Sequence, residues 1–188
     1  MIKIYKLGED VLREKAEPVA EVTDEIRKLI DDMFEAMIAH EGVGLAGPQV
    51  GKKLRIFIAL ADDNVRRVFI NPQIVSTSQE LSDYEEGCLS IPGVYETIRR
   101  PMRVTVQALN EKGKPFTLEA DGLLARIIQH EVDHLNGILF IDRGDKAFAE
   151  KTTLQFKRRE EKLAKKKAER ERKQQRIAAK IAAKEKRA

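Results

Sequence analysis

Apolar residues recur every three or four positions between residues 24 and 39, which predicts an amphipathic helix over Asp24–Ala39. The next stretch, residues 42–51, contains four glycines and one proline, and we expect no regular element there. Beyond it, short apolar runs alternate with turn residues, as is typical of strands. We expect strands over residues 54–60, 68–70, 74–81, 102–109 and 116–120. Asn71-Pro72 should end the second strand, and residues 110–114 should form a hairpin turn.

A second helix is predicted between Asp121 and the pair Asn136-Gly137. Aspartate is a good N-cap residue, and an Asn-Gly pair commonly ends a helix. The apolar stripe of this helix consists of Leu124, Ile127, Ile128 and Leu135. Strands that surround one buried helix predict an α+β fold, with antiparallel sheets packed around that helix.

Residues 151–188 differ in composition from the rest of the chain. Lys, Arg, Glu, Ala and Gln predominate, and neither Gly nor Pro occurs. The formal net charge is +11 in this part and −7 in residues 1–150. These residues form helices well but include few apolar side chains, so the segment cannot bury a core of its own. We expect a globular domain over residues 1–150 and a basic extension, helical or partly disordered, over residues 151–188.

The composition also excludes several classes of protein. The chain has one cysteine, which excludes an intramolecular disulfide. The first 15 residues lack the apolar core of a signal peptide, and no run approaches the roughly 18 apolar residues of a membrane span. We therefore expect a cytoplasmic protein with no membrane partner, in which the thiol stays reduced.

The second predicted helix carries HEVDH, residues 130–134, with two of the three histidines of the chain. Residues four apart lie on one face of a helix, so His130 and His134 can bind one divalent metal ion. Glu131 then remains free to move protons, and Asp133 should face away from the metal in a structural role. The alternative is a solvated helix on which two unrelated histidines happen to have this spacing.

A catalytic zinc-type site has three protein ligands and an open position, whereas a structural site has four. In one zinc-peptidase pattern the third ligand lies six residues after the second histidine, where this chain has Phe140. Cys88, His40 and a carboxylate remain as candidates. Cys88 is the strongest of them, because the adjoining Gly87 lets the backbone approach closely. The alternative for a lone cysteine is a small buried apolar side chain. His40 is assigned no role.

Three separated segments resemble the signature motifs of the peptide deformylases in order and spacing: GVGLAGPQVG (42–51), EGCLS (86–90) and QHEVDHLNG (129–137). The resemblance covers roughly residues 1–150, which it identifies as a catalytic domain, and it does not include the basic extension. The family usually has Ala where this chain has Gly47. The resemblance implies that Cys88, His130 and His134 bind the metal. It favours Fe(2+), and the sulfur and nitrogen donors would also suit Zn(2+), Ni(2+) or Co(2+).

The resemblance also implies the reaction, which is removal of the formyl group from the N-terminal formyl-methionine of newly synthesised polypeptides, with release of formate. This is a metal-dependent hydrolysis of an amide. Glu131 would take a proton from water and pass it to the leaving amine. By resemblance, the side-chain amide of Gln49 and the backbone N–H of Leu89 would stabilise the oxyanion.

Four further residues are expected to bind substrate. Leu123 and Ile127 precede the histidine pair on the same helix, so they are candidate walls of an apolar pocket for methionine. The backbone at Val43 and Gly44 could hold an extended peptide as an added strand.

The basic extension suggests a partner, since a helix with a net charge of +11 is attracted to phosphate backbones. Ribosomal RNA near the exit of nascent chains is the candidate, and a solvated charged helix is the alternative. Two other functions compete for the whole chain. One is a general HExxH peptidase with a carboxylate as third ligand, and the other is a non-enzymatic RNA adaptor.

Overall fold

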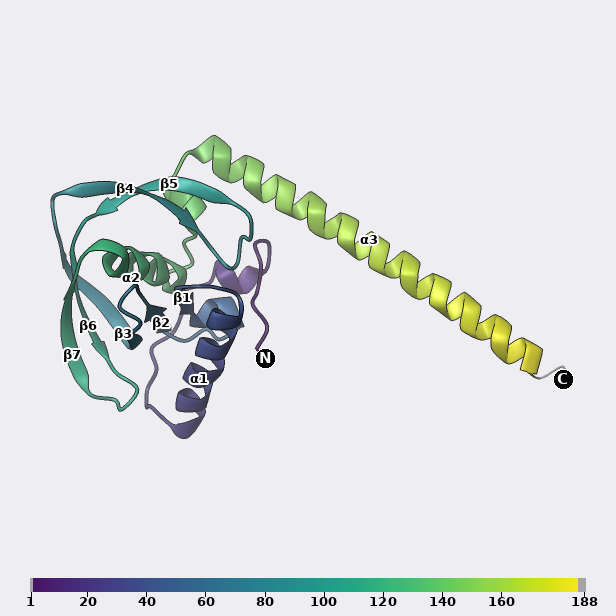
Figure 1. The fold of residues 1–188 in the computed structure, drawn as a ribbon, viewed down its shortest axis with the longest axis horizontal. Helices are drawn as coiled ribbons and strands as arrows, with labels where there is room; N and C mark the ends of the chain where they lie inside the picture. Colours follow the sequence, from purple (N-terminus) through teal and green to yellow (C-terminus); the bar gives the residue numbers. More distant parts are fainter. Residues whose placement is uncertain (1, 186–188) are drawn as a thin grey trace. The chain divides into compact units, whose positions relative to one another are not determined.

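The computed structural model describes the backbone of residues 2–185 and the side chains of residues 2–175. The chain forms two compact units, residues 1–149 and residues 150–188. The first unit has the predicted α+β fold, in which helix α2 lies between a five-stranded sheet and a two-stranded hairpin (Figure 1). In chain order its elements are η1 (Asp10–Leu12), α1 (Asp24–Ala39), β1 (Gly44–Ala46), η2 (Gly47–Val50), β2 (Ile56–Leu60), β3 (Arg66–Thr77), β4 (Leu81–Gly87), β5 (Tyr95–Pro101), β6 (Val104–Leu109), β7 (Pro115–Ala120), α2 (Gly122–Leu135) and η3 (Phe140–Arg143).

Helix α1 has the predicted bounds, Asp24–Ala39. Its apolar stripe is buried and includes Met33, Phe34 and Met37. The stripe belongs to a core cluster that also contains apolar residues of β2 and β3. The helical period of the sequence therefore predicted this element and its buried face correctly.

The five-stranded sheet is antiparallel throughout and has the order β1-β2-β3-β6-β7. Strand β3 continues through Asn71-Pro72, so the prediction that this pair ends a strand is wrong. The register against β6 shifts between Ile70 and Gln73, and Asn71 has a φ of 52°. The Asn71 side chain also binds the backbone N–H and C=O of Val19, each at 2.8 Å. A bulge fixed by these two bonds accommodates the proline within the strand.

The glycine-rich segment also contains regular structure, contrary to expectation. Residues 44–46 form β1, one of the two edge strands of the five-stranded sheet, and pair with β2 in a register that places Gly44 opposite Ala59. The glycine at 44 has a steric cause, because a Cβ atom there would overlap the Glu131 carboxylate. The glycine that suggested a loop is therefore needed where the strand passes close to the helix.

Strands β4 and β5 pair with each other, and within residues 2–185 they join no other sheet. The sequence did not predict β5, and of the predicted strand 74–81 the first four residues belong to β3 and only Leu81 to β4. Alternate residues of the hairpin are buried, namely Glu86, Ile98 and Arg100. The hairpin therefore presents mainly charged side chains to the interior.

Helix α2 carries HEVDH and is buried along most of its length, as predicted. Asp121 occupies the N-cap position, but its side chain makes no capping hydrogen bond. The helix ends at Leu135, followed by Asn136 and by Gly137 with a φ of 73°. A Cβ atom at Gly137 would overlap the Arg13 backbone, so the predicted stop also has a packing reason.

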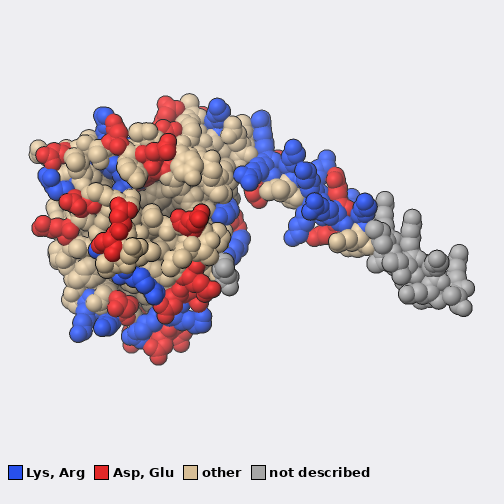
Figure 2. All heavy atoms as spheres, viewed as in Figure 1, with Lys and Arg blue, Asp and Glu red and all other residues tan. Residues whose placement is uncertain are grey.

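Helix α3 has the bounds Lys146–Glu185 and accounts for the described part of the second unit, so the predicted helical extension is present. All side chains of residues 157–175 are exposed. Figure 2 shows Lys and Arg over most of this described surface, with fewer Asp and Glu between them. Among the described residues, no helix combines the length and apolar character that a membrane crossing requires.

Candidate metal centre

Three predicted metal ligands from two distant segments meet at one point. Cys88 follows β4 directly, while His130 and His134 lie one turn apart on α2. One donor atom of each residue lies within 4.8 Å of the others. The Cys88 Sγ is 3.2 Å from the His134 Nε2, and the two imidazole centroids are 5.0 Å apart. The folded chain therefore assembles one sulfur and two nitrogen donors around a common position.

Glu131 lies beside this group without belonging to it. Its side chain is buried, and within the described residues its Oε2 has no hydrogen-bond partner. Burial raises the pKa of this carboxyl to about 7, because the charged form is poorly solvated. A carboxyl with such a pKa can both accept and release a proton near neutral pH.

The two histidines have different surroundings. The His130 Nδ1 lies 2.9 Å from the Glu86 Oε2, which leaves its Nε2 available to a metal. Burial opposes protonation of His130, but Cys88 and Glu86 outweigh it and raise its pKa well above 6.5. Burial lowers the pKa of His134 well below that value, and the His130 charge adds to the effect. The His134 Nδ1 is buried with no partner among the described residues.

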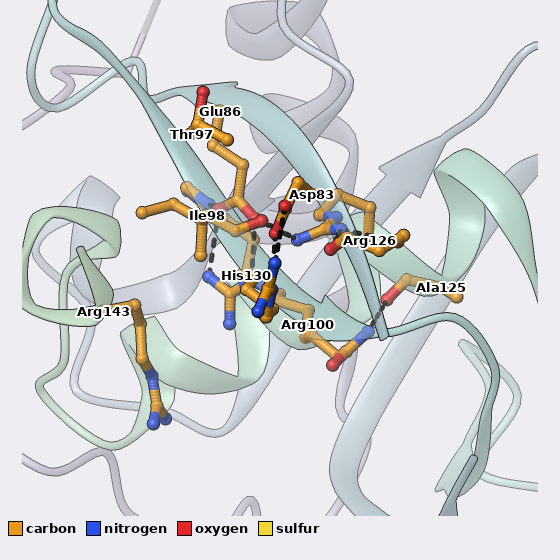
Figure 3. A network of polar contacts seen from close by, with 12 residues as sticks. Asp83, Glu86, Thr97, Ile98, Arg100, Ala125, Arg126, His130 and Arg143 are labelled. Carbon is orange, nitrogen blue, oxygen red and sulfur yellow. Dashed lines mark hydrogen bonds and ion pairs between the residues drawn. The ribbon is translucent and has the colours of Figure 1, made fainter. Parts of the chain in front are cut away.

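Glu86 is the centre of a buried polar network that the sequence did not reveal (Figure 3). Arg100 Nε donates to its Oε1 at 2.7 Å, and Arg126 Nη1 donates to the same oxygen at 3.0 Å. Burial alone would raise the pKa of Glu86, but the hydrogen bonds with His130 and Arg100 hold it at about 2. Glu86 is therefore a stable anion that fixes the His130 ring.

Asp133 extends the network and does not belong to the group of three candidate metal ligands. Arg100 Nη1 donates to its Oδ2 at 2.7 Å, and Arg143 Nε donates to the same atom at 3.0 Å. Arg100 thus joins two buried carboxylates, one from the hairpin and one from α2.

A cavity of about 470 Å³ is lined by two of the three candidate ligands, Cys88 and His130. The predicted substrate-binding residues Val43, Gly44, Leu123 and Ile127 all line it. So do the predicted catalytic residues Gln49, Leu89 and Glu131. Of the predicted site residues, His134 alone is absent from the described lining. The cavity therefore brings together residues from three separate segments of the sequence, 40–49, 84–95 and 123–131.

The amide of Gln49 has a fixed orientation. Its Oε1 accepts a hydrogen bond of 2.7 Å from the Ala46 N–H, and its Nε2 donates to the Ser90 Oγ at 3.2 Å. The same Nε2 lies 3.4 Å from the Cys88 Sγ. The NH₂ group of Gln49 therefore points toward the candidate metal position.

Sequence reasoning missed Glu86, Arg100 and Arg126, as well as two tyrosines, Tyr84 and Tyr95, that line the cavity. One signal was available, because Glu86 precedes Cys88 by two residues and so lies on the same side of an extended chain. From the sequence alone, Arg100 and Arg126 are indistinguishable from ordinary surface arginines.

The comparisons with known proteins agree with this geometry. The family model described as polypeptide deformylase matches residues 1–149. A peptide deformylase from Treponema pallidum (strain Nichols) is 55% identical over 139 residues, which is 74% of this chain and 85% of that protein. The chain belongs to the polypeptide deformylase family. A second relative, the peptide deformylase of Azotobacter vinelandii, is 50% identical over 76% of this chain and 86% of its own length.

Solved deformylase structures share the fold. One from Ehrlichia chaffeensis has a TM-score of 0.83 and 37% identity, and the match covers 87% of this chain and 99% of that chain. Another, from Synechococcus elongatus in complex with actinonin, has a TM-score of 0.76 and 43% identity over 80% of this chain and 83% of that chain.

The residues of this deformylase-family chain fit a catalytic divalent metal ion. A thiolate and two imidazoles suit iron, zinc, nickel or cobalt, and three ligands leave one tetrahedral position open. In the described residues, no further His, Cys, Asp or Glu joins the group. Glu131, which directly follows His130 in the sequence, has a buried Oε2 with no hydrogen-bond partner among these residues. A structural site with four protein ligands does not fit this donor set.

Proposed function

We propose that Cys88, His130 and His134 hold one divalent ion with which this chain hydrolyses the N-formyl group of newly synthesised polypeptides, releasing formate. The observation that carries the proposal is the approach of these three donors to one another beside buried Glu131. Family membership supports the same reaction, since the relatives are peptide deformylases.

Fe(2+) is the proposed working ion, with Zn(2+) or Ni(2+) as alternatives that the same donors accept. When bound, such an ion lowers the pKa of a water molecule and polarises the carbonyl under attack. The Nδ1–H of His130 donates a hydrogen bond to Glu86, which keeps Nε2 as the metal-binding atom. A cytoplasmic location, where the single thiol stays reduced, is part of the proposal.

Three residues perform the remaining chemistry in this proposal. Glu131 takes a proton from the attacking water and delivers it to the amine that leaves. The Gln49 NH₂ group and the Leu89 N–H stabilise the negative charge that develops on the formyl oxygen when water attacks the formyl carbon. Two observations support these roles, since the Gln49 amide is held in place and the Leu89 N–H has no acceptor among the described residues.

The substrate enters through the cavity of about 470 Å³. Leu123 and Ile127 form the apolar wall for the methionine side chain. Val43 and Gly44, at the start of the edge strand β1, offer backbone hydrogen bonds to the main chain of the peptide. Such contacts recognise the main chain of the peptide more than the side chains that follow the methionine. This suits an enzyme that acts on many different nascent chains.

Formate release from formyl-Met-Ala, together with the bound metal per chain, tests the proposal. Cys88→Ala should lose both metal and activity, because two imidazoles alone bind the ion weakly. His40→Ala is a matched control, since this third histidine lines the same cavity but lies outside the ligand group. A general HExxH peptidase would instead cleave internal peptide bonds, and its Cys88→Ala variant would keep the metal.

The basic extension is proposed as a separate region that binds ribosomal RNA, while residues 1–150 form the catalytic domain. Support comes from residues 157–175, all exposed, in which ten Lys and Arg accompany four Glu. A full-length chain should sediment with ribosomes, and binding should weaken steeply with salt. Deletion of residues 157–188 should abolish the binding and leave formate release unchanged. Equal sedimentation of both forms would contradict the proposal, and binding without any formate release would favour an RNA adaptor.

A further inference from the structure

The β4–β5 hairpin forms one wall of the cavity and leads directly to Cys88, yet no sheet holds it in place. Within the described residues, its two strands pair with each other and with no third strand. Ile98 is its one fully buried apolar side chain, and the other buried residues are Glu86 and Arg100. Apolar packing alone therefore does not define how far the hairpin stands from α2.

Arg126 of α2 makes a direct connection to both strands of the hairpin. Its Nη1 donates to the Ile98 carbonyl on β5 at 2.9 Å and to the Glu86 carboxylate on β4 at 3.0 Å. Its Nη2 donates to the carbonyl and the hydroxyl of Ser82 on β4, at 2.9 and 3.0 Å. Figure 3 shows Arg126 in this network together with Glu86 and Ile98. Two of the four acceptors are backbone oxygens, so Arg126 fixes the path of the hairpin itself.

The same side chain lines the cavity next to the proposed methionine pocket. Leu123 and Ile127 lie beside it on α2, and Tyr84 faces it from β4 with its ring centroid 5.6 Å from the Arg126 Cζ. Arg126 is only 6% exposed, and both terminal nitrogens already have protein acceptors. It is therefore poorly suited to pair with an acidic ligand, and its position between the two walls matters more than its charge.

We propose that Arg126 is a positioning residue that sets the width of the methionine pocket by holding the β4–β5 hairpin at a fixed distance from α2. The proposal rests on the proposed function, because it takes the formyl-methionine side chain as the occupant. A lysine at this position has one nitrogen and cannot reproduce the planar fork that reaches Ile98 and Ser82 together. Without the Arg126 guanidinium, the β4–β5 hairpin should be able to move relative to α2. The pocket should then select less strongly for methionine over larger side chains.

Formate release from formyl-Met-Ala, formyl-norleucyl-Ala and formyl-Phe-Ala tests the proposal on the metal-loaded protein. In Arg126→Lys and Arg126→Met, KM for formyl-Met-Ala should rise roughly tenfold while kcat changes less than about threefold. The ratio of kcat/KM for the Met substrate to that for the Phe substrate should fall roughly tenfold. Bound metal should stay at the wild-type level, since none of the three ligands is altered.

Arg99→Met is the matched control, because Arg99 lies on the same hairpin but is exposed and outside the cavity lining. This variant should leave KM and kcat/KM unchanged for all three substrates. Ser82→Ala removes a single acceptor and should lower the Met-to-Phe ratio less, which keeps the test decisive if Arg126→Met fails to fold. An unchanged ratio in Arg126→Lys and Ser82→Ala, or a loss confined to kcat, would overturn the proposal. Absence of formate from the wild type would instead reject the proposed function.

Discussion

The buried network around α2 and the exposed helix α3 contain the same charged residue types in opposite settings. In the network each charge has defined partners, and Arg100, which is buried, contacts Glu86 and Asp133. Along residues 157–175 all side chains are exposed. Removal of one buried charge leaves its partner unpaired in the interior, whereas solvent compensates for a lost charge on the helix. The position of each charge therefore matters in the network, and the total charge matters on α3.

The same contrast appears between two neighbouring residues of β5. Side chains alternate along a strand, so Arg99 and Arg100 point to opposite faces. Arg99 pairs with Asp83 at the surface, where the two side chains are 67% and 49% exposed. One strand thus contains a matched pair of arginines in which burial is the main difference.

The largest effect should come from Glu131, a buried carboxyl without an ion pair among the described residues. Glu131→Gln keeps the shape of the side chain but cannot carry a proton, so formate release should fall by roughly 10²–10⁴-fold with the metal still bound. Glu41→Gln is the control, because Glu41 lines the same cavity but is exposed. Near-normal turnover by the Glu131 variant would show that this carboxyl is not the proton carrier.

The arginine pair should separate buried from exposed charges in stability. Arg100→Met leaves two carboxylates buried without their shared partner and should lower the free energy of unfolding by about 3–5 kcal/mol. Arg99→Met should lower it by less than about 1 kcal/mol, because solvent screens the exposed pair. Urea denaturation of the three proteins measures both values. An equal loss of unfolding free energy in the two variants would mean that burial does not determine how much each arginine contributes to stability.

An exposed pair outside the network should show that a low pKa alone does not bring large stability. Hydrogen bonds from Arg67 and from the Val65 N–H hold the pKa of Asp63 at about 2, below its ordinary 3.8. Its folded pKa is depressed, so its contribution is complete above about pH 4 and is lost as the pH falls toward 2. The stability difference between wild type and Asp63→Asn should be small and should vanish across this window. A difference as large as that for Arg100→Met would contradict the comparison.

The sequence predicted the elements and residues that depend on local pattern. Helix α1 follows from its apolar period, and the candidate ligands follow from the spacing of HEVDH and from Cys88. Strand β1 was missed because Gly44 suggested a loop. The glycine is required because a Cβ atom there would overlap the carboxylate of Glu131, which is distant in the sequence. Strand β5 was missed because one of its buried residues is Arg100, which has no apolar signal and is buried only through its distant carboxylate partners.

The smallest effect on stability should come from the basic helix. Replacement of Lys165, Lys166 and Lys167 by Gln removes three exposed positive charges and no buried contact. Each change should alter the free energy of unfolding by less than about 0.5 kcal/mol, and formate release from a short peptide should stay the same. Ribosome binding depends on the total charge, so the triple variant should bind more weakly and with a flatter dependence on salt. The same three-charge loss distributed over Lys157, Lys162 and Lys173 should have an equal effect on binding. A strong difference between the two sets would mean that particular positions on α3, and not its charge alone, recognise the partner.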